Sequence, residues 1–183
     1  MNESEPILPQ RRTLRLPDFD YSAAGAYFVT VCSYHRALSF NDEGVWSMMK
    51  DVWEELPAHF SHVRTDAFVV MPNHVHGVLF ITGRRARHAS PLPERPPHPP
   101  GTGGPGPAAG SLGVIVGSFK SAVARRINGL LATPGAQIWQ RNYYEHVFRD
   151  EEKLNVIRRY IEENPLRWSE DVYNPDRVIK GKP

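Results

Sequence analysis

The sequence has a single cysteine, Cys32, and no long hydrophobic run. One cysteine excludes a disulfide framework and a zinc site built from several cysteines. The longest uninterrupted apolar stretch, residues 67–71, is far too short for a membrane-spanning helix, which needs about 18 apolar residues or more. Residues 1–5 are acidic and lack the apolar segment of a secretory signal. We therefore expect a cytoplasmic protein with no membrane partner.

A strong charge of one sign is also missing, because the 183 residues carry 22 Lys and Arg against 20 Asp and Glu, for a net charge of +2. The two signs are unevenly distributed. Residues 1–82 hold 6 basic and 10 acidic side chains, residues 83–110 hold 4 and 1, and residues 111–183 hold 12 and 9. The basic second half permits a polyanionic partner, and a solvated surface of mixed charge explains the same numbers.

Proline and glycine are plentiful, but they are concentrated in one segment. Eight of the 17 prolines lie between positions 91 and 107. Such a stretch forms neither a helix nor a strand ladder, and it has little apolar surface to offset the entropy of ordering. We expect one domain over residues 1–183, with its core at about 11–168 and residues 83–110 as a flexible insertion.

Hydrophobic periodicity on both sides of the insertion predicts regular elements. Pro57 is expected to stop the first helix, and Pro165 to end the last helix near Asn164 after an N-cap at Asp150. The order β-α-β-β-α-β predicts an α+β, ferredoxin-like antiparallel sheet with helices on one face and one extra C-terminal helix. Strands are expected at residues 26–33, 64–71, 74–81, 138–140 and 145–149, and helices at 44–59, 111–128 and 151–164.

The most informative stretch, residues 71–78, reads MPNHVHGV. On a strand, His74 and His76 point to the same face, so two imidazoles can share one divalent cation. Gly77 leaves room for a backbone or a ligand to approach closely. Two half-exposed histidines without a metal are the alternative. A histidine-triad hydrolase is excluded, because its third histidine position is Val78.

A nucleophile and a third ligand are expected on the last helix. Tyr160 and Asn164 are one helical turn apart, so they share a face that we expect at the sheet edge, pointing at the two histidines. A phenol with a pKa near 10 is a poor nucleophile at neutral pH, and a nearby cation helps it to ionise. The amide oxygen of Asn164 is a hard ligand that suits Mg²⁺ or Mn²⁺. Without such a cation, Tyr160 is an ordinary residue on a helix flank.

Four motifs together resemble the REP-associated tyrosine transposases, which belong to the single-tyrosine HUH superfamily and have an IS200-like transposase domain. The motifs are RRTLRL at 11–16 with GAYFVTVC at 25–32, MPNHVH at 71–76, GSFKS at 117–121, and WQRNYYEHV at 139–147 with YIEENP at 160–165. They occur in the family's order, which makes the resemblance far more specific than two histidines alone.

The resemblance implies a ferredoxin-like fold and a metal-dependent endonuclease and strand transferase. Its substrate would be single-stranded or hairpin DNA from REP palindromes in the bacterial nucleoid, and its intermediate a 5′-phosphotyrosine. His74 and His76 match the metal ligands, Asn164 a further ligand, and Tyr160 the catalytic tyrosine in the final helix, with Mg²⁺ or Mn²⁺ as cofactor. A monomer is implied, and whether Tyr160 serves its own or a partner's histidines stays open.

Several aromatic and basic residues are further candidates. Tyr143 and Tyr144 compete with Tyr160 as nucleophiles or could stack on a base, whereas Trp139 is expected in the core. The alternative functions are a domesticated module that binds structured DNA or RNA without cutting it, and a metal hydrolase that uses no tyrosine. The candidate phosphate contacts are Lys120, Arg125, Arg126, Arg141, Arg158 and Arg159, with Arg11, Arg12 and Arg15 as an N-terminal arm.

Overall fold

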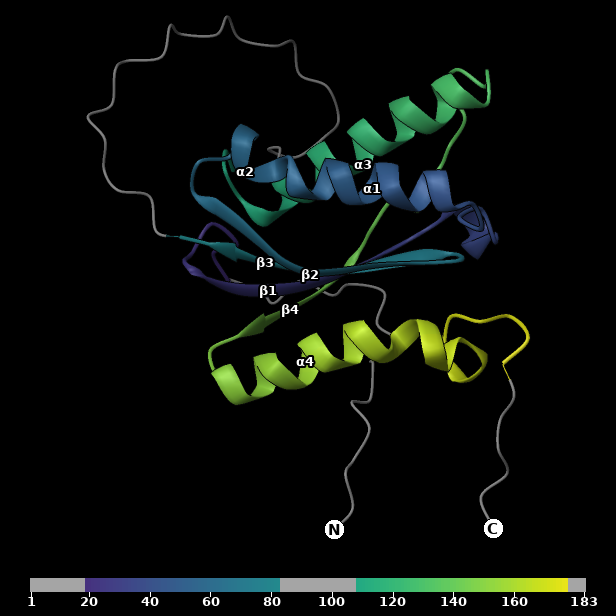
Figure 1. Cartoon of the computed structure of the whole chain (residues 1–183). Helices are drawn as coiled ribbons and strands as arrows, with labels where there is room; N and C mark the ends of the chain where they lie inside the picture. The colour runs from purple at the N-terminus through teal and green to yellow at the C-terminus, as the bar shows by residue number, and fades with distance from the viewer. Residues whose placement is uncertain (1–18, 83–107, 178–183) are drawn as a thin grey trace, which may run out of the picture.

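The computed structural model describes residues 19–82 and 108–177, and the predicted order of strands and helices is confirmed there (Figure 1). Arg11, Arg12, Arg15 and most of the 83–110 insertion lie outside the described residues. The strands are β1 (Gly25–Cys32), β2 (Val63–Met71), β3 (His74–Ile81) and β4 (Tyr144–Phe148). The helices are α1 (Glu43–Glu54), α2 (Leu56–His59), α3 (Leu112–Leu130) and α4 (Glu151–Glu163), with short 3-10 helices η1 (Tyr34–Arg36) and η2 (Asn164–Glu170).

The four strands form one antiparallel sheet in the order β2-β3-β1-β4. The predicted hairpin between β2 and β3 turns at Pro72 and Asn73. Strand β1 lies inside the sheet and is buried along nearly its whole length, which explains why its residues after Gly25 are apolar except for Thr30. The α+β, ferredoxin-like class expected from the sequence is confirmed.

Helices cover both faces of the sheet (Figure 1). Helices α1, α2 and α3 cover one face, which we call the core face; it includes Val29 and Val75. Helix α4 crosses the other face, the site face, which includes Phe28 and Val78, and packs against β2, β3 and β4. From the sequence, we expected the helix that carries Tyr160 at the edge of the sheet. It lies over the site face instead, because Leu154 and Ile161 are buried against that face.

One prediction about proline and one about glycine need correction. Pro57 does not simply stop a helix: α1 ends at Glu54, and Pro57 lies in the first turn of α2, where a missing N–H costs nothing. Gly77 leaves no room for a ligand, because a Cβ there would lie 2.6 Å from the ring of Trp53 on the core face. Close packing of Trp53 on β3 therefore requires this glycine.

The remaining predictions concern residues 138–140 and the two ends of α4. Residues 138–140 form only an isolated bridge between Ser33 and Trp139, not a strand. Asp150 caps α4 as predicted, because its carboxylate accepts a hydrogen bond from the Glu152 N–H at 2.9 Å. Helix α4 ends at Glu163, and the chain continues as η2 with Pro165 in its first turn. None of the helices in the described ranges is long and apolar enough to cross a bilayer.

Candidate metal centre and nucleophile

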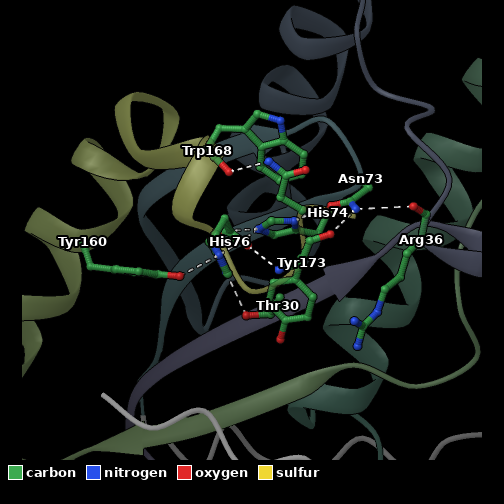
Figure 2. Close-up of polar contacts among 10 residues, drawn as sticks. Thr30, Arg36, Asn73, His74, His76, Tyr160, Trp168 and Tyr173 are labelled. Carbon is green, nitrogen blue, oxygen red and sulfur yellow. Dashed lines mark hydrogen bonds and ion pairs between the residues drawn. The ribbon is translucent and has the colours of Figure 1, made fainter. Parts of the chain in front are cut away.

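The two histidines of β3 form the centre of a buried polar cluster on the site face (Figure 2). Strand alternation gives His74 and His76 the same face, and both are fully buried. Their Nε2 atoms are 3.0 Å apart. On an ion with metal–nitrogen distances of about 2.1 Å, two ligand atoms at a right angle lie about 3 Å apart. The spacing of the pair therefore fits two neighbouring positions on one cation.

Hydrogen bonds at the other ring nitrogens orient both imidazoles. His74 Nδ1 donates to Asn73 Oδ1 at 2.8 Å, and His76 Nδ1 pairs with Thr30 Oγ1 at 2.8 Å. The Asn73 amide oxygen can only accept, so His74 carries its proton on Nδ1 and presents a lone pair on Nε2. Metal-binding histidines are held in this way by partners at the second nitrogen. A proton or a cation between the two Nε2 atoms is then needed to relieve lone-pair repulsion.

Asp171, at the end of η2, is the acidic residue of the cluster, and nothing in the sequence singled it out. Its Oδ2 lies 3.9 Å from His74 Nε2, and potential ligand atoms of His74, His76 and Asp171 all lie within 4.8 Å of one another. Its Oδ1 accepts a hydrogen bond from the Tyr173 N–H at 2.6 Å, which leaves Oδ2 directed at the histidines. Two imidazoles and a carboxylate form a donor set for a divalent cation.

Burial sets the protonation of this cluster. It lowers the pKa of His76 to about 3 and that of His74 well below its usual range, with neighbouring His76 and Arg36 adding to the effect on His74. Both imidazoles are therefore neutral, the form that binds metals. Burial also raises the pKa of Asp171, which the Tyr173 N–H, Arg177 and Asn164 partly offset. A buried carboxylate beside two neutral imidazoles is costly, and a divalent cation would balance it.

Tyr160 reaches the same cluster from α4. Its hydroxyl lies 3.4 Å from His76 Nε2, and the two ring centroids are 5.4 Å apart (Figure 2). Burial, helped by the charge of Asp171, raises the pKa of Tyr160 to about 12, and Asn164 acts in the opposite direction. Without a cation the phenol therefore keeps its proton at neutral pH. The Tyr160 hydroxyl therefore lies beside the histidines of its own chain.

Asn164 lies next to these groups, as its helical spacing from Tyr160 predicted. It is 2% exposed, and its side chain lies close enough to lower the pKa values of Tyr160 and Asp171. Its Nδ2 is buried without a hydrogen-bond partner in standard geometry. Since a hydrogen bond that lowers the pKa of an acid is one that it accepts, the amide nitrogen of Asn164 faces Tyr160 and Asp171. That Asn164 binds a metal stays a prediction, beside the carboxylate of Asp171.

Other tyrosines occupy different surroundings. Tyr143 packs against the hydrophobic core of the core face. Tyr144 is on the site face, with its ring centroid 6.2 Å from that of Phe28. Tyr173, which the sequence did not single out, has its ring 4.7 Å from that of His74, and burial raises its pKa further than that of Tyr160. Among these, Tyr160 is the tyrosine whose hydroxyl meets the histidine pair.

A protein from Haemophilus influenzae described as uncharacterized is 35% identical to this chain over 175 residues, which are 88% of this chain and 91% of that protein. The two proteins belong to one family. No protein-family model matches the chain. A solved structure of a REP-associated tyrosine transposase bound to a REP hairpin is similar to the chain with a TM-score of 0.57 and 15% identity, over 86% of this chain and 74% of that one. The resemblance seen in the motifs is thus confirmed at the level of the fold.

Three of the basic residues expected to contact phosphate have partners within the chain. Lys120 Nζ donates to two backbone carbonyls, at 2.5 and 3.0 Å, and burial lowers its pKa. Arg126 pairs with a carboxylate at 2.7 Å, and Arg158 binds two carboxylates at 2.6 Å each. Lys120 and Arg126 lie on α3, across the sheet from the histidines. Contacts of the exposed Arg125, Arg141 and Arg159 with nucleic acid stay predictions, whereas the core position of Trp139 is confirmed.

Proposed function

We propose that the chain is a metal-dependent endonuclease and strand transferase that cuts single-stranded DNA next to REP-type hairpins, with Tyr160 as its nucleophile. One observation carries the proposal: the Tyr160 hydroxyl lies 3.4 Å from His76 Nε2, inside a buried cluster that also contains His74 and Asp171. The shared fold with a transposase bound to a REP hairpin supports DNA as the substrate class.

The residues of the cluster fit a divalent cation, Mg²⁺ or Mn²⁺. His74 and His76 would hold it through Nε2, with an oxygen of Asp171 or Asn164 as the third protein ligand. Such a cation supplies a Lewis acid that polarises the scissile phosphate and offsets its developing negative charge. Nitrogen atoms of the two neutral imidazoles and an oxygen of the buried Asp171 carboxylate already lie within 4.8 Å of one another, so small side-chain shifts would be enough to bind it.

In the proposed reaction, the Tyr160 phenol loses its proton and its oxygen attacks phosphorus in line. The bond between phosphorus and the 3′-oxygen breaks, and that oxygen takes up a proton and leaves as a free 3′-OH. The 5′-phosphate stays attached to Tyr160. Because the covalent link retains the phosphodiester energy, a second 3′-OH can reverse the step and join strands without ATP. We propose that Tyr160 serves the histidines of its own chain, of which His76 lies 3.4 Å from its hydroxyl, and that the protein acts as a monomer.

The proposal is tested by incubating the purified protein with a labelled DNA hairpin and Mn²⁺ and looking for a covalent protein–DNA species. Wild type should form one, and Tyr160→Phe should not. Tyr144→Phe is the matched control, because Tyr144 is also partly buried on the site face but packs on Phe28. The proposal is wrong if wild type gives no covalent species, or if Tyr160→Phe still gives one.

A second candidate is a metal phosphodiesterase that attacks with water. Asp171 favours it, because this residue supplies the acidic ligand that the sequence near His74 lacks. It predicts turnover of DNA without a covalent species, and full activity of Tyr160→Phe.

The third possibility is a module that only binds structured DNA or RNA. It predicts binding that is insensitive to EDTA and no cleavage with any metal. The same experiment therefore separates the three functions.

A further inference from the structure

The turn that follows β1 has an unusual backbone beside the histidine pair. His35 and Arg36 have φ values of 53° and 55°, the left-handed region that side chains other than glycine rarely adopt. Backbone hydrogen bonds hold the turn: the Arg36 N–H donates to Ser33 O at 3.0 Å, and the Ala37 N–H donates to Tyr34 O at 3.1 Å. Residues kept in this region of backbone conformation cluster at binding and catalytic sites. The side chains of this turn are therefore candidates for binding a ligand.

Asn73 fastens this turn to the candidate metal centre. Its fully buried side chain accepts a hydrogen bond from His74 and donates to the carbonyl of Arg36 at 3.3 Å (Figure 2). The same Nδ2 donates to the carbonyl of Tyr173 at 2.6 Å. One amide thus fixes a histidine of the pair, the turn of Arg36 and the segment that follows Asp171. The position of Arg36 is therefore linked rigidly to that of the histidines.

The guanidinium of Arg36 lies at the border of the cluster, on an exposed side chain. It stacks over the ring of Tyr173, with Cζ 5.0 Å from the centroid, and this ring lies 4.7 Å from that of His74. Burial lowers the pKa of His74 and raises those of Cys32 and Tyr173; the nearby charge of Arg36 adds to the first shift and offsets part of the other two. Within residues 19–82 and 108–177, the Arg36 guanidinium makes no ion pair or hydrogen bond, unlike Arg158.

We propose that Arg36 is a phosphate-binding residue of this centre, whose guanidinium binds a nucleic-acid phosphate held beside His74 and His76. A guanidinium offers parallel N–H donors that match phosphate oxygens, and stacking on an aromatic ring leaves the donors at its edge free. The strained and clamped backbone explains how an exposed side chain keeps one direction. This assignment rests on the proposed function, because it takes a nucleic-acid strand as the ligand.

The test compares Arg36→Gln with Arg64→Gln in binding a labelled DNA hairpin with a single-stranded flank, in EDTA, over a range of salt concentrations. Arg64 is the matched control: it is exposed, stacks over Phe80 at 4.2 Å, and lies on β2 far along the sheet from His74. Arg36→Gln should bind roughly tenfold more weakly. Its slope of log affinity against log salt should become shallower by about 0.7, the value for one lost contact to a single strand. Arg64→Gln should match wild type.

Arg36→Lys keeps the charge but not the paired donors, so it should retain the wild-type salt slope and lose only part of the affinity. Circular dichroism melting should show both Arg36 variants folded, because the side chain is exposed. If wild type binds and cuts DNA but Arg36→Gln behaves like Arg64→Gln, this inference is overturned and the proposed function stands. If wild type does not bind the hairpin, both are overturned.

Discussion

The two faces of the sheet are both buried, but they are buried with different chemistry. On the core face, Val75 and Leu79 of β3 pack among apolar side chains from α1 and α3. On the site face, the same strand presents His74 and His76, whose ring nitrogens meet polar groups, although the ring of His76 also stacks on Phe28. Alternate residues of one strand thus serve stability and chemistry separately. Buried polar groups contribute little net stability, so a cluster of them indicates a function.

The site face itself is divided along its length. At the end of β3 near Ile81, Leu154 of α4 packs with Phe148 of β4 in an ordinary apolar cluster. At the end near His74, the chain after α4 brings Asp171 against the histidines. The apolar end anchors the helix, and this anchoring fixes where Tyr160 and the residues after it arrive. Substitutions on the site face near His74 should therefore reduce activity and change stability little. Substitutions on the core face should reduce stability and change activity little.

The largest effect is expected from His76→Leu on the site face. If His76 is a metal ligand as proposed, this change should reduce cleavage of the DNA hairpin at least about a thousandfold, since metal ions supply several kcal/mol of transition-state stabilisation. The unfolding free energy without metal should stay within about 1.5 kcal/mol of wild type, because an apolar side chain of similar size replaces a neutral polar one.

Urea unfolding and a cleavage assay measure the two quantities separately. Saturating Mn²⁺ should stabilise wild type by about 2.7 kcal/mol when its concentration is a hundred times the dissociation constant. The same addition should leave His76→Leu unchanged. Equal stabilisation of both proteins by Mn²⁺ would show that the cation binds elsewhere.

Gly77→Ala, one residue along the strand, should reverse this pattern. Its new methyl group would lie 2.6 Å from the Trp53 ring on the core face, and Trp53 is nearly fully buried and cannot withdraw. Overpacking of this kind costs about 1–3 kcal/mol of unfolding free energy. Cleavage measured well below the melting temperature should stay near the wild-type level, because the histidines face the other way. Loss of metal binding with unchanged stability would contradict the separation of the two faces.

The comparison also shows what the sequence can predict. Strand alternation was enough to put His74 and His76 on one face, and helical spacing was enough to bring Asn164 close to Tyr160. The fold followed from periodicity, because its apolar stripes are regular on both faces. Asp171 and Arg36 could not be found in this way. They lie in irregular segments after η2 and β1, where hydrogen bonds of Asn73, not hydrophobic spacing, determine the approach to the histidines.

Asn73→Asp tests this dependence on hydrogen bonds and should have the smallest effect. Aspartate keeps an oxygen to accept from His74 Nδ1 but turns the second oxygen toward the carbonyls of Arg36 and Tyr173, which then repel it. Residues 171–177 should exchange their amide hydrogens faster, because the Tyr173 carbonyl loses its hydrogen bond to residue 73. Asn128→Asp is the control, because it loses a similar bond, to Ala136 O at 3.0 Å, at an exposed site on α3. Unchanged exchange of residues 171–177 in Asn73→Asp would mean that packing around Trp168 and Tyr173 alone holds this segment, and that the site face is stabilised in the same way as the core face.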